Sequence, residues 1–154
     1  MCIRDSYYDY ASGDSDPNNG KVTTFNDVFP FGHYYLGWAD LVGRRNIQDL
    51  NAHLLFYPTQ WTTLWLQYHH FWLAQNQDAL YGAAGIPIRR DATGQSGGNV
   101  GNEIDVVVNF HLTSYSDFMF GYSRLFGGGF LKGTASPLTA VDSDLAFFMY
   151  QLKW

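Results

Sequence analysis

Glu103 and Asp105 are two positions apart, so any β-strand that holds them presents both carboxyl groups on one face. Two neighbouring carboxyl groups can serve a glycosidase as acid and base, or as acid and nucleophile. Here, however, Ile104, Val106 and Val108 are apolar at the alternate positions. We therefore interpret the pair as part of the polar wall of an amphipathic strand, in preference to a catalytic pair.

Arginine and lysine are the side chains that would bind a carboxylate on a substrate. The sequence has nine of them against fourteen acidic residues, with a formal net charge of -5. They form no cluster or basic helix, which argues against a nucleic-acid partner. The candidates for a path that carries anions are Arg44, Arg45, Arg124 and Lys153, with Arg89 and Arg90 on a loop that could fold inward.

The histidines could ligate a metal ion or act as hydrogen-bonding groups. They are His33, His53, His69, His70 and His111. Their spacing matches no zinc motif, and the single cysteine, Cys2, excludes an internal disulfide and a cysteine-based zinc site. We therefore expect no cofactor and interpret the histidines as hydrogen-bonding groups of a channel.

Asp14, Asp16 and Asn18 alternate as at the start of a calcium loop. Gly20 comes one position late, and no Glu stands at the final ligand position, so an ordinary turn rich in Asp, Asn and Gly is the alternative.

No serine lies in a nucleophile-elbow motif, and no glycine-rich loop has a Walker lysine. We predict that the protein is not an enzyme.

The elements that position these residues are β-strands, and the last one is the clearest. Between Asp144 and Trp154, apolar residues alternate with a mixed face. An aromatic last residue after such alternation resembles the closing strand of a bacterial outer-membrane β-barrel, which the barrel-assembly machinery recognises. The residues of this assembly signal are Phe148, Tyr150, Leu152 and Trp154.

The composition agrees with a membrane barrel. Aromatic residues make up 18% of the chain, the mean hydropathy is -0.21, and no apolar run could form a membrane-spanning helix. Alternating lipid-facing and lumen-facing residues produce such an average, and aromatic residues gather at the membrane interfaces.

The sequence predicts an all-β fold of about six antiparallel strands. We expect them near residues 7–11, 46–57, 61–74, 101–113, 117–126 and 143–154, with long loops at 12–45, 75–100 and 127–142 and tight turns at 58–60 and 114–116. Barrels of this class have long extracellular loops and short periplasmic turns, which places the carboxyl terminus on the periplasmic side. Since eight strands are the usual minimum for closure, we expect an open, curved sheet that is part of a larger up-and-down barrel.

The alternation also assigns one face of each strand to the lumen. Arg124 shares a face with Phe120 and Tyr122, but we place it inward because an arginine at the bilayer midplane costs about 2–4 kcal/mol. His70 falls on the lipid side near the outer rim. The predicted pore-lining residues are Arg44, Arg45, Asn51, His53, Trp65, Gln67, His69, Glu103, Asp105, Asn109, His111, Arg124, Gln151 and Lys153.

The first six residues, Met1 to Ser6, resemble a translated adapter fused to a truncated gene. No signal peptide precedes the barrel pattern, although an outer-membrane protein needs one. We therefore interpret residues 1–154 as the carboxyl-terminal part of one barrel domain, and Cys2 as a residue without function.

The loop ahead of the second strand resembles a segment of the alginate export family. The residues that carry the resemblance are Phe29-Pro30, His33, Gly37, Asp40 and Gly43-Arg44-Arg45-Asn46, after Tyr10-Ala11-Ser12-Gly13-Asp14. The resemblance implies a porin-sized barrel in the lipid of the bacterial outer membrane, whose aqueous lumen passes an alginate-like anionic polysaccharide or a related anion.

Three alternatives stay open. The barrel could be a general porin for small solutes, and lumenal Glu103 and Asp105 would suit a lumen that does not favour anions. An outer-membrane lipase barrel would need a serine and a histidine within hydrogen-bond reach. A soluble carbohydrate-binding β-barrel would turn the apolar face of residues 101–113 into a filled core and the carboxylates toward solvent.

Overall fold

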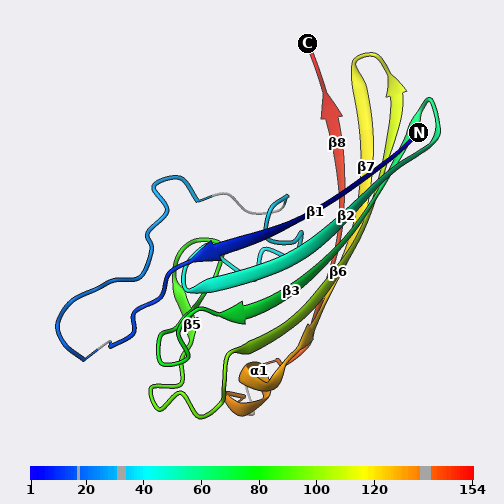
Figure 1. Ribbon diagram of the computed structural model, residues 1–154. Helices are drawn as coiled ribbons and strands as arrows, with labels where there is room; N and C mark the ends of the chain where they lie inside the picture. The colour runs from blue at the N-terminus through cyan, green and yellow to red at the C-terminus, as the bar shows by residue number, and fades with distance from the viewer. Residues whose placement is uncertain (17, 31–33, 136–139) are drawn as a thin grey trace.

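The computed structural model describes residues 1–16, 18–30, 34–135 and 140–154. Six antiparallel strands form one sheet in the order β1-β2-β3-β6-β7-β8. Their bounds are β1 Cys2–Ala11, β2 Ile47–Thr59, β3 Thr62–Leu73, β6 Asn99–Thr113, β7 Ser116–Gly127 and β8 Ser143–Leu152. Because β1 and β8 are edges, the sheet is not closed, and Figure 1 shows that it is curved. The predicted all-β, open antiparallel sheet is confirmed.

The connections are sorted by length between the two ends of the sheet. Figure 1 shows the β2–β3 and β6–β7 turns at the same end as both termini, with the long loops at the other end. These loops carry a small hairpin, β4 (Leu80–Tyr81) and β5 (Pro87–Arg89), and a short helix, α1 (Gly129–Gly133), none of which was predicted. Within the described residues, no helix has the length and apolar character needed to cross a membrane.

The first strand is longer than its sequence pattern indicated. β1 begins at Cys2, and it pairs with β2 from Cys2 opposite Phe56 to Ala11 opposite Ile47. Residues 2–6 do not alternate clearly between apolar and polar side chains. Their extended conformation therefore comes from pairing with β2. The interpretation of residues 1–6 as foreign sequence stays a prediction.

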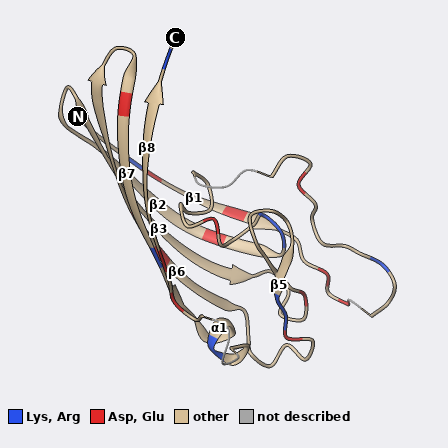
Figure 2. Ribbon diagram, turned by 180° about the vertical axis from the view of Figure 1, so that it is seen from behind, with Lys and Arg blue, Asp and Glu red and all other residues tan. Residues whose placement is uncertain are grey.

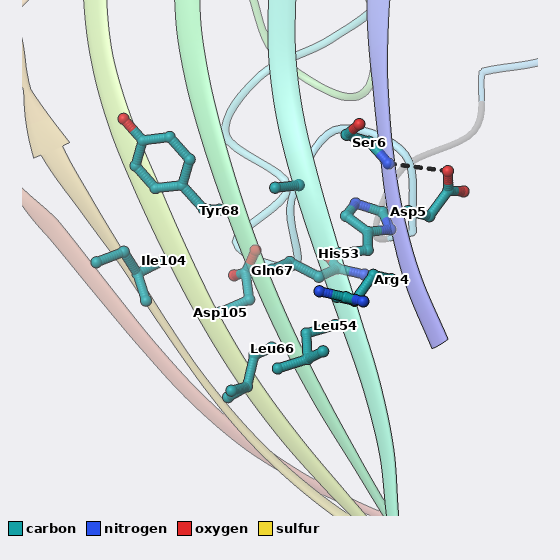
Figure 3. Close-up of a pocket in the computed structure, with 11 residues that line it drawn as sticks. Arg4, Asp5, Ser6, His53, Leu54, Leu66, Gln67, Tyr68, Ile104 and Asp105 are labelled. Atoms are coloured by element: carbon teal, nitrogen blue, oxygen red, sulfur yellow. Dashed lines mark hydrogen bonds between the residues drawn. The ribbon is translucent and has the colours of Figure 1, made fainter. Parts of the chain in front are cut away.

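The outward face of the sheet is apolar and exposed. Ile104 is 45% exposed, Phe120 49% and Phe148 78%, whereas the alternate residues Glu103 and Asp105 are 0% exposed. Figure 3 shows a hollow along β1, β2, β3 and β6, which is lined by the apolar side chains of Leu54, Leu66 and Ile104 and also by polar residues such as Arg4. An exposed apolar face opposite a buried polar one is the reverse of a soluble sheet packed on an apolar core, and it suits contact with lipid.

A small apolar core lies where the long loops fold back onto the inward face. Ile47, Phe71, Leu73, Val100 and Leu125 come from the strands. Leu36, Val42, Leu80, Phe130 and Leu131 from the loops and α1 pack against them. Parts of the long loops therefore pack on the concave side, while much of the β1–β2 loop extends away from the sheet (Figure 1).

The predicted inward placement of Arg124 is wrong. Arg124 lies opposite Ile104 in the β6–β7 register, on the outward face. Its guanidinium donates to Asp144 at 3.1 Å and lies 5.0 Å from the centre of the Phe126 ring. The position is close to the loop end of β7, so the guanidinium can reach an interface together with its carboxylate partner. The midplane penalty therefore does not apply, and no bulge is needed.

The exposed row of Phe148, Tyr150, Leu152 and Trp154, along β8 and just beyond it, provides the first testable prediction. If this row is an assembly signal, we expect Trp154→Gln to lower the yield of assembled, heat-modifiable barrel in bacterial outer membranes several-fold. The control is Lys153→Gln, which changes the neighbouring residue and leaves the outward row intact. Equal yields from the two variants would show that the terminal aromatic residue is not recognised.

Candidate pore wall and its covering loop

A band of buried polar side chains crosses the concave face on β2, β3 and β6. In one row Asn51 pairs with His69 and His69 with Glu103. In the next row His53 pairs with Gln67 and Gln67 with Asp105. We call these residues, together with Asp49, the polar strip; all seven, Asp49, Asn51, His53, Gln67, His69, Glu103 and Asp105, are at most 8% exposed. Asp49 was not among the predicted site residues.

His69 connects two carboxylates within the strip. Its Nδ1 lies 2.9 Å from Oδ2 of Asp49, and its Nε2 lies 3.9 Å from Oδ2 of Asp105. The amide of Asn51 donates to Asp49 at 2.8 Å. Within the described residues, no lysine or arginine forms an ion pair with Asp49, Glu103 or Asp105. Among the described residues, His69 is thus the basic side chain that lies within 4 Å of Asp49 and Asp105.

Residues 34–39 of the long β1–β2 loop, which we call the covering segment, lie over the strip. The backbone N–H of Ala39 donates to Oε1 of Glu103 at 3.0 Å, and the N–H of Trp38 donates to Oδ1 of Asp105 at 3.4 Å. Gly37 has φ 86°, and a Cβ added there would lie 2.2 Å from Oε1 of Glu103. Only glycine fits this close approach, which explains why residue 37 of the loop motif is a glycine.

Aromatic rings surround the covering segment. The Trp38 ring stacks on Phe147 of β8 with centroids 5.3 Å apart, and it lies 5.9 Å from Trp65 of β3. The Tyr34 ring meets Trp65 at 5.6 Å and His53 at 5.8 Å. The concave side therefore presents aromatic surface above the buried carboxyl groups. Such surfaces can stack against sugar rings.

Asn46 fixes the end of this loop. It is fully buried with φ 50°, and its side-chain oxygen accepts the N–H of Gln75 at 2.7 Å. Its amide donates to the carbonyls of Gln75 at 3.0 Å and Ala79 at 2.9 Å. Three residues earlier, the N–H of Gly43 donates to Tyr81 at 2.8 Å. The Gly-x-x-Asn of the motif thus ties two long loops together, a role that the sequence alone did not reveal.

Arg89 and Arg90 join loops to one another. Arg89 donates to the carbonyl of Leu131 at 2.9 Å and also to that of Ala140, while Arg90 donates to Gln77 at 2.9 Å. In the same loop, hydrogen bonds from Thr93 and Ser96 hold the pKa of Asp91 well below its usual range. These contacts fold the loop and engage both arginines with backbone carbonyls.

The other basic candidates pair with carboxylates at the two ends of the sheet. At the loop end, Arg44 donates to Asp9 at 2.7 Å. Arg45 there donates to Asp27 at 3.0 Å. At the turn end, Lys153 pairs with Asp117, which also meets Nδ1 of His111 at 2.7 Å. Figure 2 shows acidic residues on the strands themselves, and both acidic and basic residues in the long loops.

The register places the remaining candidates on the inward face. Trp65 lies opposite Val107, Asn109 opposite Met119, and Gln151 opposite Asp117. That these inward residues line a pore stays a prediction. His70 lies on the outward face, opposite Leu50, as expected. His33 lies outside the described residues.

The calcium candidate has the contacts of a turn. Oδ1 of Asp14 accepts the N–H of Asp16 at 3.1 Å and the hydroxyl of Thr23 at 3.2 Å. Oδ1 of Asp16 accepts the N–H of Asn18 at 3.3 Å. Within the part of the chain that the structure describes, no three His, Cys, Asp or Glu side chains are grouped to hold a metal. The Asp/Asn turn accounts for this segment.

Comparison with known proteins adds one finding. The family model described as alginate export matches residues 6–140. The search of curated proteins returned no match, and neither did the search of solved structures. The match includes the covering segment, Asn46, the second part of β1 and all of the strands from β2 to β7.

Proposed function

The chain belongs to the alginate export family, and from that premise we propose that it forms part of an outer-membrane channel for an anionic, alginate-like polysaccharide. The family suggests an outer-membrane channel for polysaccharide export, and it is a family of transport porins and not of enzymes. The alginate-like nature of the polymer and its negative charge go beyond what the family match shows, and we propose both.

The observation that carries the proposal is the opposite character of the two faces of the sheet. Its outward face exposes Leu50, Ile104 and Phe120, while its inward face bears the polar strip and the inserted loop. Edge strands in lipid need partners for their backbone groups, so a closed barrel would pair the free edges of β1 and β8 with other strands.

The charges available to a passing polymer support an anionic substrate. Glu103, Asp105 and Asp49 are 0% exposed, whereas the side chains of Arg44 and Lys153, which pair with Asp9 and Asp117, are both 52% exposed. These two cations lie near opposite ends of the sheet, where they can attract carboxylates entering or leaving. The aromatic rings between them suit the faces of the sugars.

Ion selectivity of the complete barrel in a planar bilayer tests the proposal. We expect anion preference, and we expect the double variant Arg44→Gln/Lys153→Gln to shift the reversal potential toward cation permeation. Arg124→Gln is the matched control, because Arg124 lies on the outward face and should not affect the current. A cation-preferring channel that is insensitive to the double variant would contradict the anionic path.

Block by polymer separates this channel from a porin for small solutes. Alginate oligomers added to one side should interrupt the single-channel current, because a chain that fits the lumen displaces the ions. A neutral glucan of the same length is the control for size alone. If both polymers leave the current unchanged, the small-solute porin is the better assignment.

A further inference from the structure

We propose that the covering segment is an electrostatic shield, which hides the carboxyl groups of Glu103 and Asp105 from the lumen and so preserves its anion preference. The inference rests on the proposed function, and it explains how a wall that contains these carboxyl groups can pass a polyanion. It makes Gly37, which contacts Glu103 closely, a residue that determines ion selectivity.

The charge beneath the segment makes a shield necessary. Among the described residues, no lysine or arginine forms an ion pair with Asp49, Glu103 or Asp105, and His69 lies near Asp49 and Asp105 only. Carboxylates exposed to water are negatively charged at neutral pH. In a narrow channel walled by low-dielectric material, such charges act strongly on passing ions. Uncovered, the strip would repel a polyanion and concentrate cations.

The contacts of the segment fit this role. Glu103 and Asp105 each accept a backbone N–H, from Ala39 and Trp38, so the segment binds them without adding another charge. Leu36, 1% exposed, anchors the segment in the apolar core. The Trp38 ring, 8% exposed, packs against Trp65 and Phe147 and adds uncharged atoms to the cover over the carboxyl groups.

The depth of burial shows that the cover is complete at these groups. Glu103, Asp105 and His69 are each 0% exposed, although they lie on the concave face of an open sheet whose outward residue Ile104 is 45% exposed. In an open sheet no opposite wall covers the inward face. The burial of the strip therefore comes from the loops packed on it.

Gly37→Ala in the complete barrel tests the shield, and Gly20→Ala is a matched control. Both glycines lie in the β1–β2 loop with positive φ, 86° and 75°. A Cβ on Gly37 would collide with the Glu103 carboxylate, whereas nothing lies within 4 Å of a Cβ on Gly20. We expect Gly37→Ala to lower the anion-to-cation permeability ratio several-fold and Gly20→Ala to leave it unchanged. Equal ratios for the two variants would overturn the proposal.

The variant Glu103→Gln/Asp105→Asn provides a second test that does not disturb the loop. Alone, it should change the permeability ratio little, because the carboxyl groups that it removes are already hidden. Combined with Gly37→Ala, it should restore the wild-type ratio. A large shift from the double variant alone would show that passing ions sense the two carboxyl groups even when the segment covers them. The shield proposal would then be wrong.

These outcomes separate the shield from the proposed function. If the wild-type channel prefers cations, the anionic path is wrong whatever Gly37→Ala does. If the wild-type channel prefers anions and Gly37→Ala behaves as Gly20→Ala does, the path stands and the shield is wrong. Heat-modifiable migration of each variant confirms that the barrel has assembled before currents are compared.

Discussion

Phe120→Arg should destabilise the assembled barrel by about 2–4 kcal/mol, the cost of an arginine near the bilayer midplane of a transmembrane barrel. Phe120 is 49% exposed on the outward face of β7, between Val108 of β6 and Phe148 of β8. All three side chains would meet hydrocarbon. Denaturant titration of the full-length barrel in lipid vesicles measures the loss in free energy of unfolding.

Met119→Arg is the matched control for this prediction. Met119 is the preceding residue, at the same depth of β7, and it pairs with Asn109 and Met149 on the inward face. An arginine there reaches the aqueous side, so we expect a loss well below that of Phe120→Arg. Equal losses at the two positions, or a larger loss at Met119, would reject the assignment of the outward face to lipid.

The sequence predicted the strands well because each face of this sheet meets a different environment. From Ile104 to Leu112 every second residue is apolar, and β6 follows that pattern there; at the start of the strand a register shift interrupts it and Val100 is buried. The prediction was poorest where alternation gives no information. Residues 2–6 show none, and their place in β1 depends on pairing with β2.

Arg124 shows where alternation combined with an energetic argument can mislead. The penalty for a midplane arginine is sound, but it depends on depth, and β6 and β8 set the register of β7. That register puts Arg124 beside Asp144 on the outward face near the loops. Depth along a strand and the partner on the next strand are both properties of the assembled sheet.

The candidate site was predicted residue by residue, but its organisation was not. Alternation placed His69, Glu103 and Asp105 on one face, yet it gave no sign that a loop would cover them. That information lies in long-range contacts, such as Ala39 with Glu103 across 64 positions of sequence. The glycine and asparagine of the family motif were the available signal, because both adopt positive φ at close contacts.

His69→Phe should destabilise the barrel by about 1–3 kcal/mol, because it leaves the buried Asp49 carboxyl group without its hydrogen bond to the His69 ring. His69 is 0% exposed and lies between Asp49 and Asp105, 2.9 Å from the first. Phenylalanine fills a similar space but leaves both carboxyl groups buried without their histidine.

His70→Phe is the control, since the neighbouring ring lies on the outward face and contacts only Asn102 at 2.7 Å among polar groups of the described chain. We expect it to cost less than about 1 kcal/mol, the usual net value of one hydrogen bond. Adding Asp49→Asn to His69→Phe should recover part of the loss, because an amide has no charge to bury. If both phenylalanine variants unfold at the same denaturant concentration, His69 does not hold the strip together, and the loops alone must stabilise its carboxyl groups.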